Sequence, residues 1–345
     1  MAAPPDRTRL VLLFGGRSAE HDVSCVSAAS VLGAIDPERY EVTPVGITLD
    51  GDWVLADAAP ERLVADGPVI DPLRVVSVAE VVVPVLHGPM GEDGTIQGLL
   101  EVAGIPYVGC GVLGSALAMD KVVAKVVLGA AGIPQVRSLA RRQGCVEPGF
   151  VDVVATELGW PVFVKPANMG SSVGVSKATD ARALGDAMDL AFVHDEWLLV
   201  EEAVTAREVE CAVLGSLDPQ ATRLGEIRPK AEFYDYEDKY SGEGAELFVP
   251  ADLPDQVHHD ARELAIRAFD ALRCDGLARV DFFYEEGGRG LLLNEVNTMP
   301  GFTPYSMYPQ LWADSGIPYS ELIDRLVALA LERHARRAAH TARPR

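Results

Sequence analysis

Blocks of apolar residues alternate with amphipathic segments along the first third of the chain. An apolar run at residues 10–14 has strand length, and a helical pattern follows at residues 19–35. Further strands are predicted at residues 40–47 and 81–86. Strands that alternate with helices predict a parallel α/β sheet, with ligand loops at the carboxyl ends of its strands.

The remainder of the chain is less regular. Residues 50–78 lack clear periodicity and are interpreted as a peripheral insertion. A helix is predicted at residues 119–131, where a Gly-Ile-Pro sequence ends it, and strands are predicted at residues 161–165 and 197–201. Residues 233–244 are polar and aromatic without a regular period, which predicts a long loop of the kind that forms lids or binding loops.

Composition narrows the class of protein. A length of 345 residues with 48% hydrophobic residues predicts two or three domains. The formal charge of −21 argues against a nucleic-acid or anionic-membrane partner, and no apolar stretch approaches the roughly 20 residues of a membrane span. The five cysteines are scattered, without a CxxC pair, and indicate reduced thiols in a cytoplasmic protein. The N-terminus lacks the long apolar region of a signal peptide.

The sharpest chemical signal is a predicted β-hairpin. Strands at residues 278–284 and 291–297 are separated by a glycine-rich acidic turn. If their pairing is centred on Gly288, four polar side chains point to one side, because side chains alternate faces along a strand. These are Arg279 opposite Asn297, and Asp281 opposite Glu295.

Two directly opposed carboxylates repel each other and weaken a sheet unless a cation lies between them. Together with the amide of Asn297, they supply the oxygen ligands that suit magnesium. The alternative is a solvated acidic sheet face. Both interpretations require an apolar opposite side, which Phe282, Leu292 and Val296 supply.

Other segments could contact a phosphate or a nucleotide. Lys165 ends an apolar strand before the Gly/Ser loop at residues 170–174, and Lys121 lies at the start of a helix. Glu201 and Glu208 flank a strand end that could contact adenine and ribose. The GxxxxGK[ST] motif is absent, so each feature alone also fits a plain turn, a surface charge or a charged strand end.

Seven segments taken in order resemble the D-alanine–D-alanine ligase family of the ATP-grasp superfamily, from about residue 10 to residue 329 except for residues 50–78. The segments are GGRSAEHDVS from Gly15, HGPMGEDGTIQG from His87, MDK ending at Lys121, VKPANMGSSVGVSK from Val164, FYDYEDKY from Phe233, ARVDFF from Ala278 and NEVNTMPGFTPYSMYP from Asn294.

The resemblance implies an ATP-grasp fold of α/β class with three domains. Residues 1–118 would form an N-terminal α/β substrate domain that includes the insertion. Residues 119–205 and 206–345 would form two lobes that clasp ATP, the second carrying the metal ligands and a mobile loop.

The resemblance also implies roles for individual residues. ATP would be bound by Lys121, Lys165, Glu201, Val204 and Glu208, and two magnesium ions, with manganese as a substitute, by Asp281, Glu295 and Asn297. The first D-alanine would contact Glu20 and His87, with Ser171 and Tyr240 linking Glu20 to the mobile loop. The second would contact Lys239, Ser306 and the backbone of Met307, and an oxyanion would be bound by Arg279 and the N–H of Gly301.

The implied activity is ATP-dependent joining of two D-alanine molecules through D-alanyl phosphate, for peptidoglycan precursors, in a cytoplasmic homodimer. The loop around Tyr240 resembles the dipeptide-forming type. A related ligase that takes D-serine or D-lactate as second substrate is the alternative. A regulatory nucleotide-binding protein is a further one, although such a protein needs no oxyanion arginine. Without the family pattern, Glu20 would be interpreted as a carboxylate in the first turn of a helix.

Overall fold

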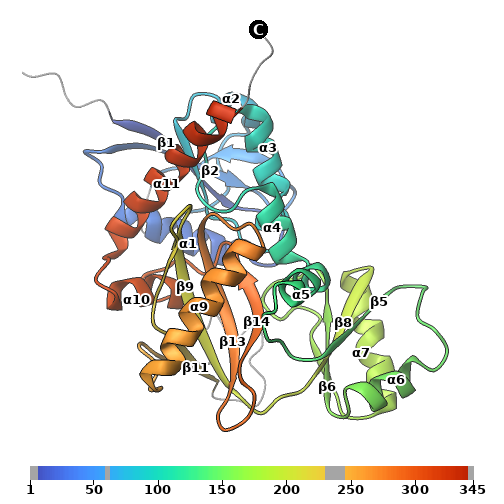
Figure 1. Ribbon diagram of the computed structural model, residues 1–345. Coiled ribbons are helices and arrows are strands. Elements are labelled where there is room, and N and C mark those ends of the chain that lie inside the picture. Colours follow the sequence, from blue (N-terminus) through green and yellow to red (C-terminus); the bar gives the residue numbers. More distant parts are fainter. Residues whose placement is uncertain (1–6, 59–62, 230–244, 341–345) are drawn as a thin grey trace, which may run out of the picture.

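The computed structural model describes residues 7–58, 63–229 and 245–340, in which the strands form three separate sheets (Figure 1). The N-terminal sheet has the strand order β3-β2-β1-β4, with β2, β1 and β4 parallel and β3 antiparallel at the edge. The predicted parallel α/β arrangement is therefore present. Its strands are β1 (Thr8–Gly15), β2 (Tyr40–Ile47), β3 (Trp53–Leu55) and β4 (Val81–Pro84).

The segment expected to be a peripheral insertion takes a larger part in this sheet than its sequence predicts. It supplies β3, and its side chains Trp53 and Val76 are buried in the same core cluster as Leu13 and Leu100. A short edge strand and a one-turn helix are too brief to show a period in sequence. The helices around this sheet are α1 (His21–Ala34), α2 (Pro72–Val76), α3 (Thr95–Ala103) and α4 (Val112–Met119).

The central sheet is antiparallel, in the order β5-β8-β6-β7, and two helices pack on it around Val164, Leu184 and Val200. The helix predicted at residues 119–131 begins two residues later, because Asp120 accepts a hydrogen bond from the Val123 N–H (2.9 Å) and caps a new helix. The elements are α5 (Lys121–Ala130), β5 (Ser138–Arg142), α6 (Phe150–Glu157), β6 (Val162–Pro166), β7 (Ser176–Ala178), α7 (Ala181–His194) and β8 (Trp197–Glu202).

The C-terminal sheet is also antiparallel, in the order β12-β11-β9-β13-β14, with β10 paired to β9. One face packs on α9 through apolar residues such as Phe269 and Phe282. The other face lies towards the central sheet. The elements are β9 (Arg207–Gly215), β10 (Gln220–Ala221), β11 (Gly225–Pro229), β12 (Ala245–Phe248), α9 (Asp255–Ala271), β13 (Gly276–Glu285) and β14 (Gly290–Asn297).

Strands β13 and β14 form the predicted hairpin with one irregularity. Asp281 lies opposite Glu295 and Arg279 opposite Asn297, as predicted. The register then shifts by one residue, because Asn294 forms a β-bulge. The turn is therefore not centred on Gly288.

The bulge also corrects one expected core position. Leu292 lies opposite Phe283 and so shares the face of Asp281, although it is buried. Leu293 takes the expected place in the core with Phe282 and Val296.

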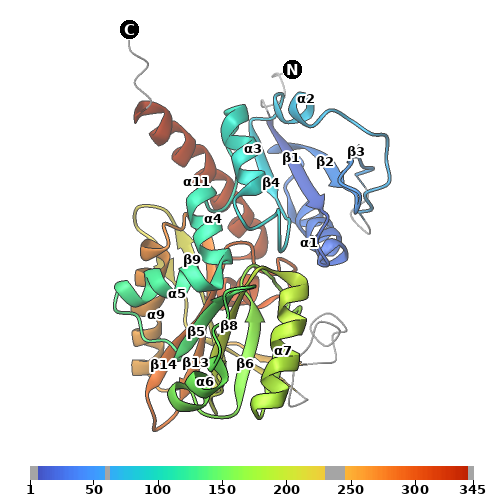
Figure 2. The ribbon, with the colours of Figure 1, turned by 90° about the vertical axis from the view of Figure 1, so that its right-hand side faces the viewer.

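The last two helices are α10 (Met307–Asp314) and α11 (Tyr319–His340), and α11 packs the C-terminal part of the chain against the N-terminal sheet. Figure 2 shows α11 running up beside α3 and α4. Its residues Leu322 and Leu326 share a core cluster with Leu10 and Leu12 of β1. Within residues 7–58, 63–229 and 245–340, no helix combines the length and apolar character needed to cross a membrane.

Candidate functional site

A cavity of about 1520 Å³ lies between the central and C-terminal sheets and is bounded at one end by loops of the N-terminal sheet. All the candidate residues that the structure describes line this one cavity. They are Glu20, His87, Lys121, Lys165, Ser171, Glu201, Val204, Glu208, Arg279, Asp281, Glu295, Asn297, Gly301, Ser306 and Met307. Lys239 and Tyr240 lie outside the described residues.

The hairpin supplies the charged floor of the cavity. The Nε and Nη2 atoms of Arg279 donate to the two carboxylate oxygens of Asp281, both at 2.7 Å. Asn297 Nδ2 donates to Asp281 Oδ2 at 2.9 Å. Burial alone would lower the pKa of Arg279, but the carboxylates of Asp281 and Glu210 raise this pKa well above its ordinary value. Arg279 is therefore a permanent cation held among carboxylates.

The same floor has a donor set that fits magnesium. Asp281 and Glu295 face each other across the hairpin, next to the Asn297 amide, and Lys121 Nζ lies 3.6 Å from Glu295 Oε2. No group of three or more His, Cys, Asp or Glu side chains placed for metal binding occurs in the described part of the chain. Asp281, Glu295 and Asn297 are the oxygen ligands that would hold magnesium, which takes only one or two carboxylates from a protein.

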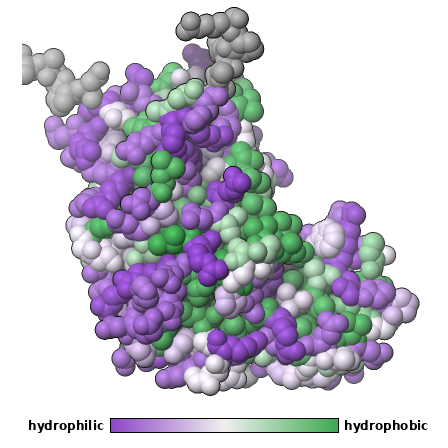
Figure 3. Space-filling view, viewed as in Figure 1, coloured by the Kyte–Doolittle hydropathy of each residue, from purple (hydrophilic) through white to green (hydrophobic). Residues whose placement is uncertain are grey.

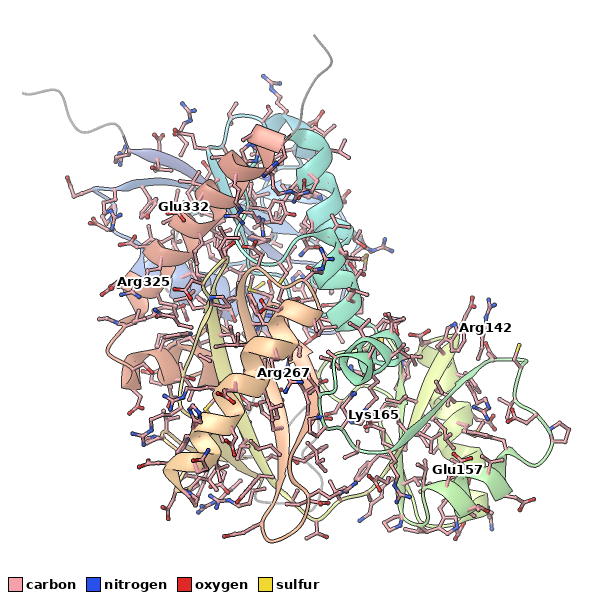
Figure 4. All side chains as sticks on the ribbon, viewed as in Figure 1. Arg142, Glu157, Lys165, Arg267, Arg325 and Glu332 are labelled. Carbon is pink, nitrogen blue, oxygen red and sulfur yellow. The ribbon has the colours of Figure 1, made fainter. Side chains whose placement is uncertain are left out.

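A buried ion triad joins α5 to the central sheet. Glu201 Oε1 lies 2.7 Å from Lys125 Nζ, and Glu201 Oε2 lies 2.6 Å from Lys165 Nζ. Burial would raise the pKa of Glu201, but the two lysines outweigh it and lower this pKa to about 2. Lys165 Nζ also donates to Asn294 Oδ1 at 3.2 Å, so the bulge residue of the hairpin contacts the central sheet. Figure 4 labels Lys165 at this junction.

Lys125 is not among the candidate residues predicted from the sequence, although it lies one helical turn after Lys121. Residues four apart lie on the same face of a helix, and this spacing is a signal that could have revealed it. Glu208 and Val204 line the same side of the cavity from β9 and from the turn that precedes it.

The N-terminal end of the cavity is built around Glu20, which is 7% exposed. Ser171 Oγ donates a hydrogen bond to Glu20 Oε1, linking the Gly/Ser loop to the start of α1. Two glycines make room for the carboxylate. A Cβ atom added at Gly88 or Gly170 would lie 2.4 Å or 2.6 Å from Glu20 Oε2.

His87 and Glu92 hold the backbone of one residue, Met299, in the loop that follows β14. His87 Nδ1 lies 2.9 Å from the carbonyl oxygen of Met299, to which it donates, and its Nε2 lies 3.1 Å from Ser27 Oγ. Burial lowers the pKa of His87, which favours the neutral imidazole. The Glu92 carboxylate accepts the N–H groups of Gly88 (2.8 Å) and Met299 (3.0 Å). Burial and the charge of Glu20 raise the pKa of Glu92 to about 8.

Glu92 is also absent from the candidate residues predicted from the sequence, although it is part of the HGPMGEDG segment. The loop that it helps to hold leads to Gly301 and Ser306. Ser306 Oγ accepts the N–H of Thr303 at 3.1 Å, and α10 begins at the next residue, Met307. The loop thus places a backbone N–H, a hydroxyl and a helix start at the cavity wall.

Known protein families and relatives match both halves of the chain. The family models described as D-ala D-ala ligase N-terminus and D-ala D-ala ligase C-terminus match residues 9–110 and 127–328. A D-alanine–D-alanine ligase of Acetivibrio thermocellus is 46% identical, with 95% of this chain and 97% of the relative covered. One from Mycolicibacterium vanbaalenii is 48% identical, with 95% and 98% covered.

Solved structures agree with these relatives. The D-alanine–D-alanine ligase of Coxiella burnetii superposes with a TM-score of 0.84 at 32% identity, covering 97% of each chain. The VanG D-Ala:D-Ser ligase of Enterococcus faecalis superposes with a TM-score of 0.83 at 35% identity, covering 94% of this chain and all of that one.

Proposed function

Because this chain belongs to the D-alanine–D-alanine ligase family, we propose that it joins two D-alanine molecules, using ATP, to form a peptidoglycan precursor. The fold is the ATP-grasp fold, and the protein is an ATP-dependent ligase. The observation that carries the proposal is that candidate residues from all three sheets and their loops line a single cavity. A protein that only bound a nucleotide would not need Glu20 and Arg279 in that cavity.

We propose that the three sheets mark three domains, at residues 1–118, 119–205 and 206–345. Each sheet falls within one of these ranges, which supports the division. Nucleotide would lie between the second and third. Lys121 and Lys165 would contact phosphates or adenine there.

We propose that Glu201, Val204 and Glu208 bind adenine and ribose. Glu201 is held as an anion by two lysines, so it can accept a hydrogen bond from the exocyclic amino group of adenine. Val204 offers apolar contact and Glu208 an acceptor for ribose hydroxyls. Their common place on the cavity wall supports this assignment.

The hairpin would hold magnesium through Asp281, Glu295 and Asn297, two ions in all, with manganese able to replace them. Bound magnesium would neutralise charge on the phosphate groups. The chain's own contribution is to hold two carboxylates opposite each other, at the cost of repulsion that a cation relieves.

The first D-alanine would bind with its ammonium at Glu20, near His87, and its carboxylate oxygen would attack the γ-phosphorus of ATP. An O–P bond forms, the bond to ADP breaks, and D-alanyl phosphate results. The hydrogen bond from Ser171 to Glu20 supports this role, because it orients the carboxylate. Tyr240 would extend the same chain of hydrogen bonds.

The second D-alanine would bind through its carboxylate to Ser306, the Met307 backbone and Lys239. Its amine would attack the acyl carbon, and phosphate would leave. Arg279 and the Gly301 N–H would stabilise the tetrahedral oxyanion, a contribution that typically changes rates by 10² to 10³. The place of Arg279 on the cavity wall supports this role, since its guanidinium is a permanent cation.

The deciding experiment is product analysis with ATP, magnesium and an equimolar mixture of D-alanine, D-serine and D-lactate. We expect D-alanyl-D-alanine as the main product and phosphate release that depends on D-alanine. A mixed product as the main species would make this a related ligase with another second substrate. No phosphate release with any acceptor would favour a regulatory nucleotide-binding protein.

We further propose a homodimer in the cytoplasm, without nucleic-acid or membrane partners. Figure 3 shows apolar residues gathered over α4 and α5, and these include Leu113 (56% exposed) and Val126 (69% exposed). Exposed apolar strips of this kind mark protein interfaces, and twofold dimers are the commonest assembly. Light scattering should give twice 36.9 kDa, and the Leu113→Glu/Val126→Glu double variant should halve that mass. A variant that stays dimeric would place the interface elsewhere.

A further inference from the structure

The metal-facing side of the C-terminal sheet carries a third carboxylate in line with the two of the hairpin. Strand β9 pairs with β13 so that Glu210 lies directly opposite Asp281, which in turn lies opposite Glu295. Cross-strand neighbours share a face. The row therefore runs across three strands, with Glu210 on β9 at one end, Asp281 on β13 in the middle and Glu295 on β14 at the other end.

Arg279 lies between two members of this row. Its Nε atom is 3.0 Å from Glu210 Oε2 and 2.7 Å from Asp281 Oδ1. Glu210 is 5% exposed and lines the cavity. A buried carboxylate needs a charged partner to stay ionised, and Arg279 supplies one.

We propose that Glu210 is a positioning residue that fixes the guanidinium of Arg279 at the reacting centre. The inference rests on the proposed oxyanion role of Arg279. Both oxygens of Asp281 accept hydrogen bonds from Arg279, yet Asp281 also belongs to the proposed metal set. With Asp281 as its only partner, Arg279 would compete with a cation for one carboxylate. Glu210 gives Arg279 a second anionic partner that lies away from the opposed pair.

Two other roles for Glu210 are less consistent with the geometry. As a third metal ligand, Glu210 would need to converge with Asp281 and Glu295, but the described residues contain no such three-carboxylate metal cluster, and Arg279 contacts both Glu210 and Asp281. As a purely structural ion pair, it would not need to face the cavity. Glu226, on β11 of the same sheet, forms structural ion pairs of this kind. It is 2% exposed, contacts Arg207 and Arg228, and is absent from the cavity wall.

The test measures binding of a tetrahedral probe by calorimetry. The probe is a phosphinate analogue of the D-alanyl-D-alanine dipeptide, added to the full-length protein with ADP and magnesium. For Glu210→Gln we expect the Kd of the analogue to rise about 10- to 100-fold, because the guanidinium of Arg279 loses one of its two anionic partners and is held less firmly in place. The Kd of ADP with magnesium alone should rise clearly less than the Kd of the analogue, because there the loss of Glu210 acts only through competition between Arg279 and the cation for Asp281.

Three variants make the result specific. Glu226→Gln, the matched control, should lose thermal stability and keep analogue affinity. Glu210→Asp, which keeps the charge, should bind the analogue more tightly than Glu210→Gln, and it serves alone if Glu210→Gln does not fold. Adding Glu210→Gln to Arg279→Lys should weaken analogue binding no further than Arg279→Lys does.

The outcomes separate this inference from the proposed function. If Arg279→Lys binds the analogue normally, the oxyanion role of Arg279 is wrong, and the inference falls with it. If Arg279→Lys loses affinity while Glu210→Gln binds like the unmodified protein, only the inference is overturned. Equal losses of ADP–magnesium and analogue affinity in Glu210→Gln would also overturn it, in favour of a metal ligand.

Discussion

Replacement of Arg333 by methionine should destabilise the contact between the C-terminal helix and the N-terminal sheet without altering the cavity. Arg333 is on α11, is 5% exposed and donates hydrogen bonds to the carbonyl oxygens of Gly109 and Tyr107, the latter at 2.8 Å. Its guanidinium carbon lies 4.4 Å from the centroid of the Tyr107 ring. Methionine keeps most of the apolar stem and removes all three contacts.

The magnitude follows from these contacts. Two hydrogen bonds from a charged donor contribute about 1.5 kcal/mol each, and the cation–π contact about 1 kcal/mol, so the loss is about 4 kcal/mol. An unfolding entropy of about 2.1 cal/mol/K per residue over 345 residues converts this into a Tm about 5 °C lower. Ligase activity at 25 °C should be unchanged, since Arg333 does not line the cavity.

Differential scanning calorimetry of the variant and a matched control tests this reasoning. Arg325 is on the same helix, labelled in Figure 4, and its side chain is 45% exposed where it pairs with Glu321 at 2.6 Å. Exposed pairs of this kind contribute about 0.5 kcal/mol, so Arg325→Met should shift Tm by less than about 1 °C. If both variants melt within a degree of the unmodified protein, burial does not strengthen the Arg333 contacts and the reasoning is refuted.

Three further predictions concern the cavity. Asp281→Asn and Glu295→Gln should each lower kcat about 100-fold or more at saturating magnesium; near-normal turnover would contradict the metal assignment. Gly170→Ala should displace Glu20 and raise KM for D-alanine about tenfold, while a helix-surface alanine at Gly185, which meets no atom within 4 Å, should have no effect. The pKa of Glu92, about 8, lies above its value in the unfolded chain, so the contribution of Glu92 to stability is present below about pH 4.5 and is lost as pH rises through 8. The free energy of unfolding should therefore fall with pH in this range, and Glu92→Gln should flatten that fall by up to about 1.4 kcal/mol per pH unit. An unchanged slope in the variant would refute the pKa shift.

Local alternation was enough to predict the hairpin face. The pattern from Arg279 to Asn297 fixes which side chains share a side, and the structure has the predicted pairs at Asp281 and Arg279. The bulge at Asn294 has no glycine or proline to signal it, and it coincides with a tertiary contact. It brings the Asn294 side chain to Lys165, which lies more than a hundred residues earlier in the chain.

Lateral neighbours in the sheet could not be predicted. The alternation in β9 places Glu208 and Glu210 on one face, yet nothing in sequence shows that β9 lies beside β13 and not beside another strand. The same limit applies to Glu92, whose partner Met299 is about two hundred residues away. Strand order and interdomain contacts depend on packing energies that no local pattern carries.

The charges of the cavity explain how an acidic chain can bind a polyanion. The formal charge is −21, but the cavity gathers Lys121, Lys165 and Arg279, and each is paired there with a carboxylate. At the proposed site, phosphate binding would therefore be an exchange of anionic partners around cations that are already in place. In the proposed site, Lys121 would turn from Glu295 to a phosphate as Glu295 turns to a cation, so neither charge would be left buried and unpaired. The opposed carboxylates and the lysines thus depend on each other, and binding of nucleotide and magnesium should be mutually cooperative.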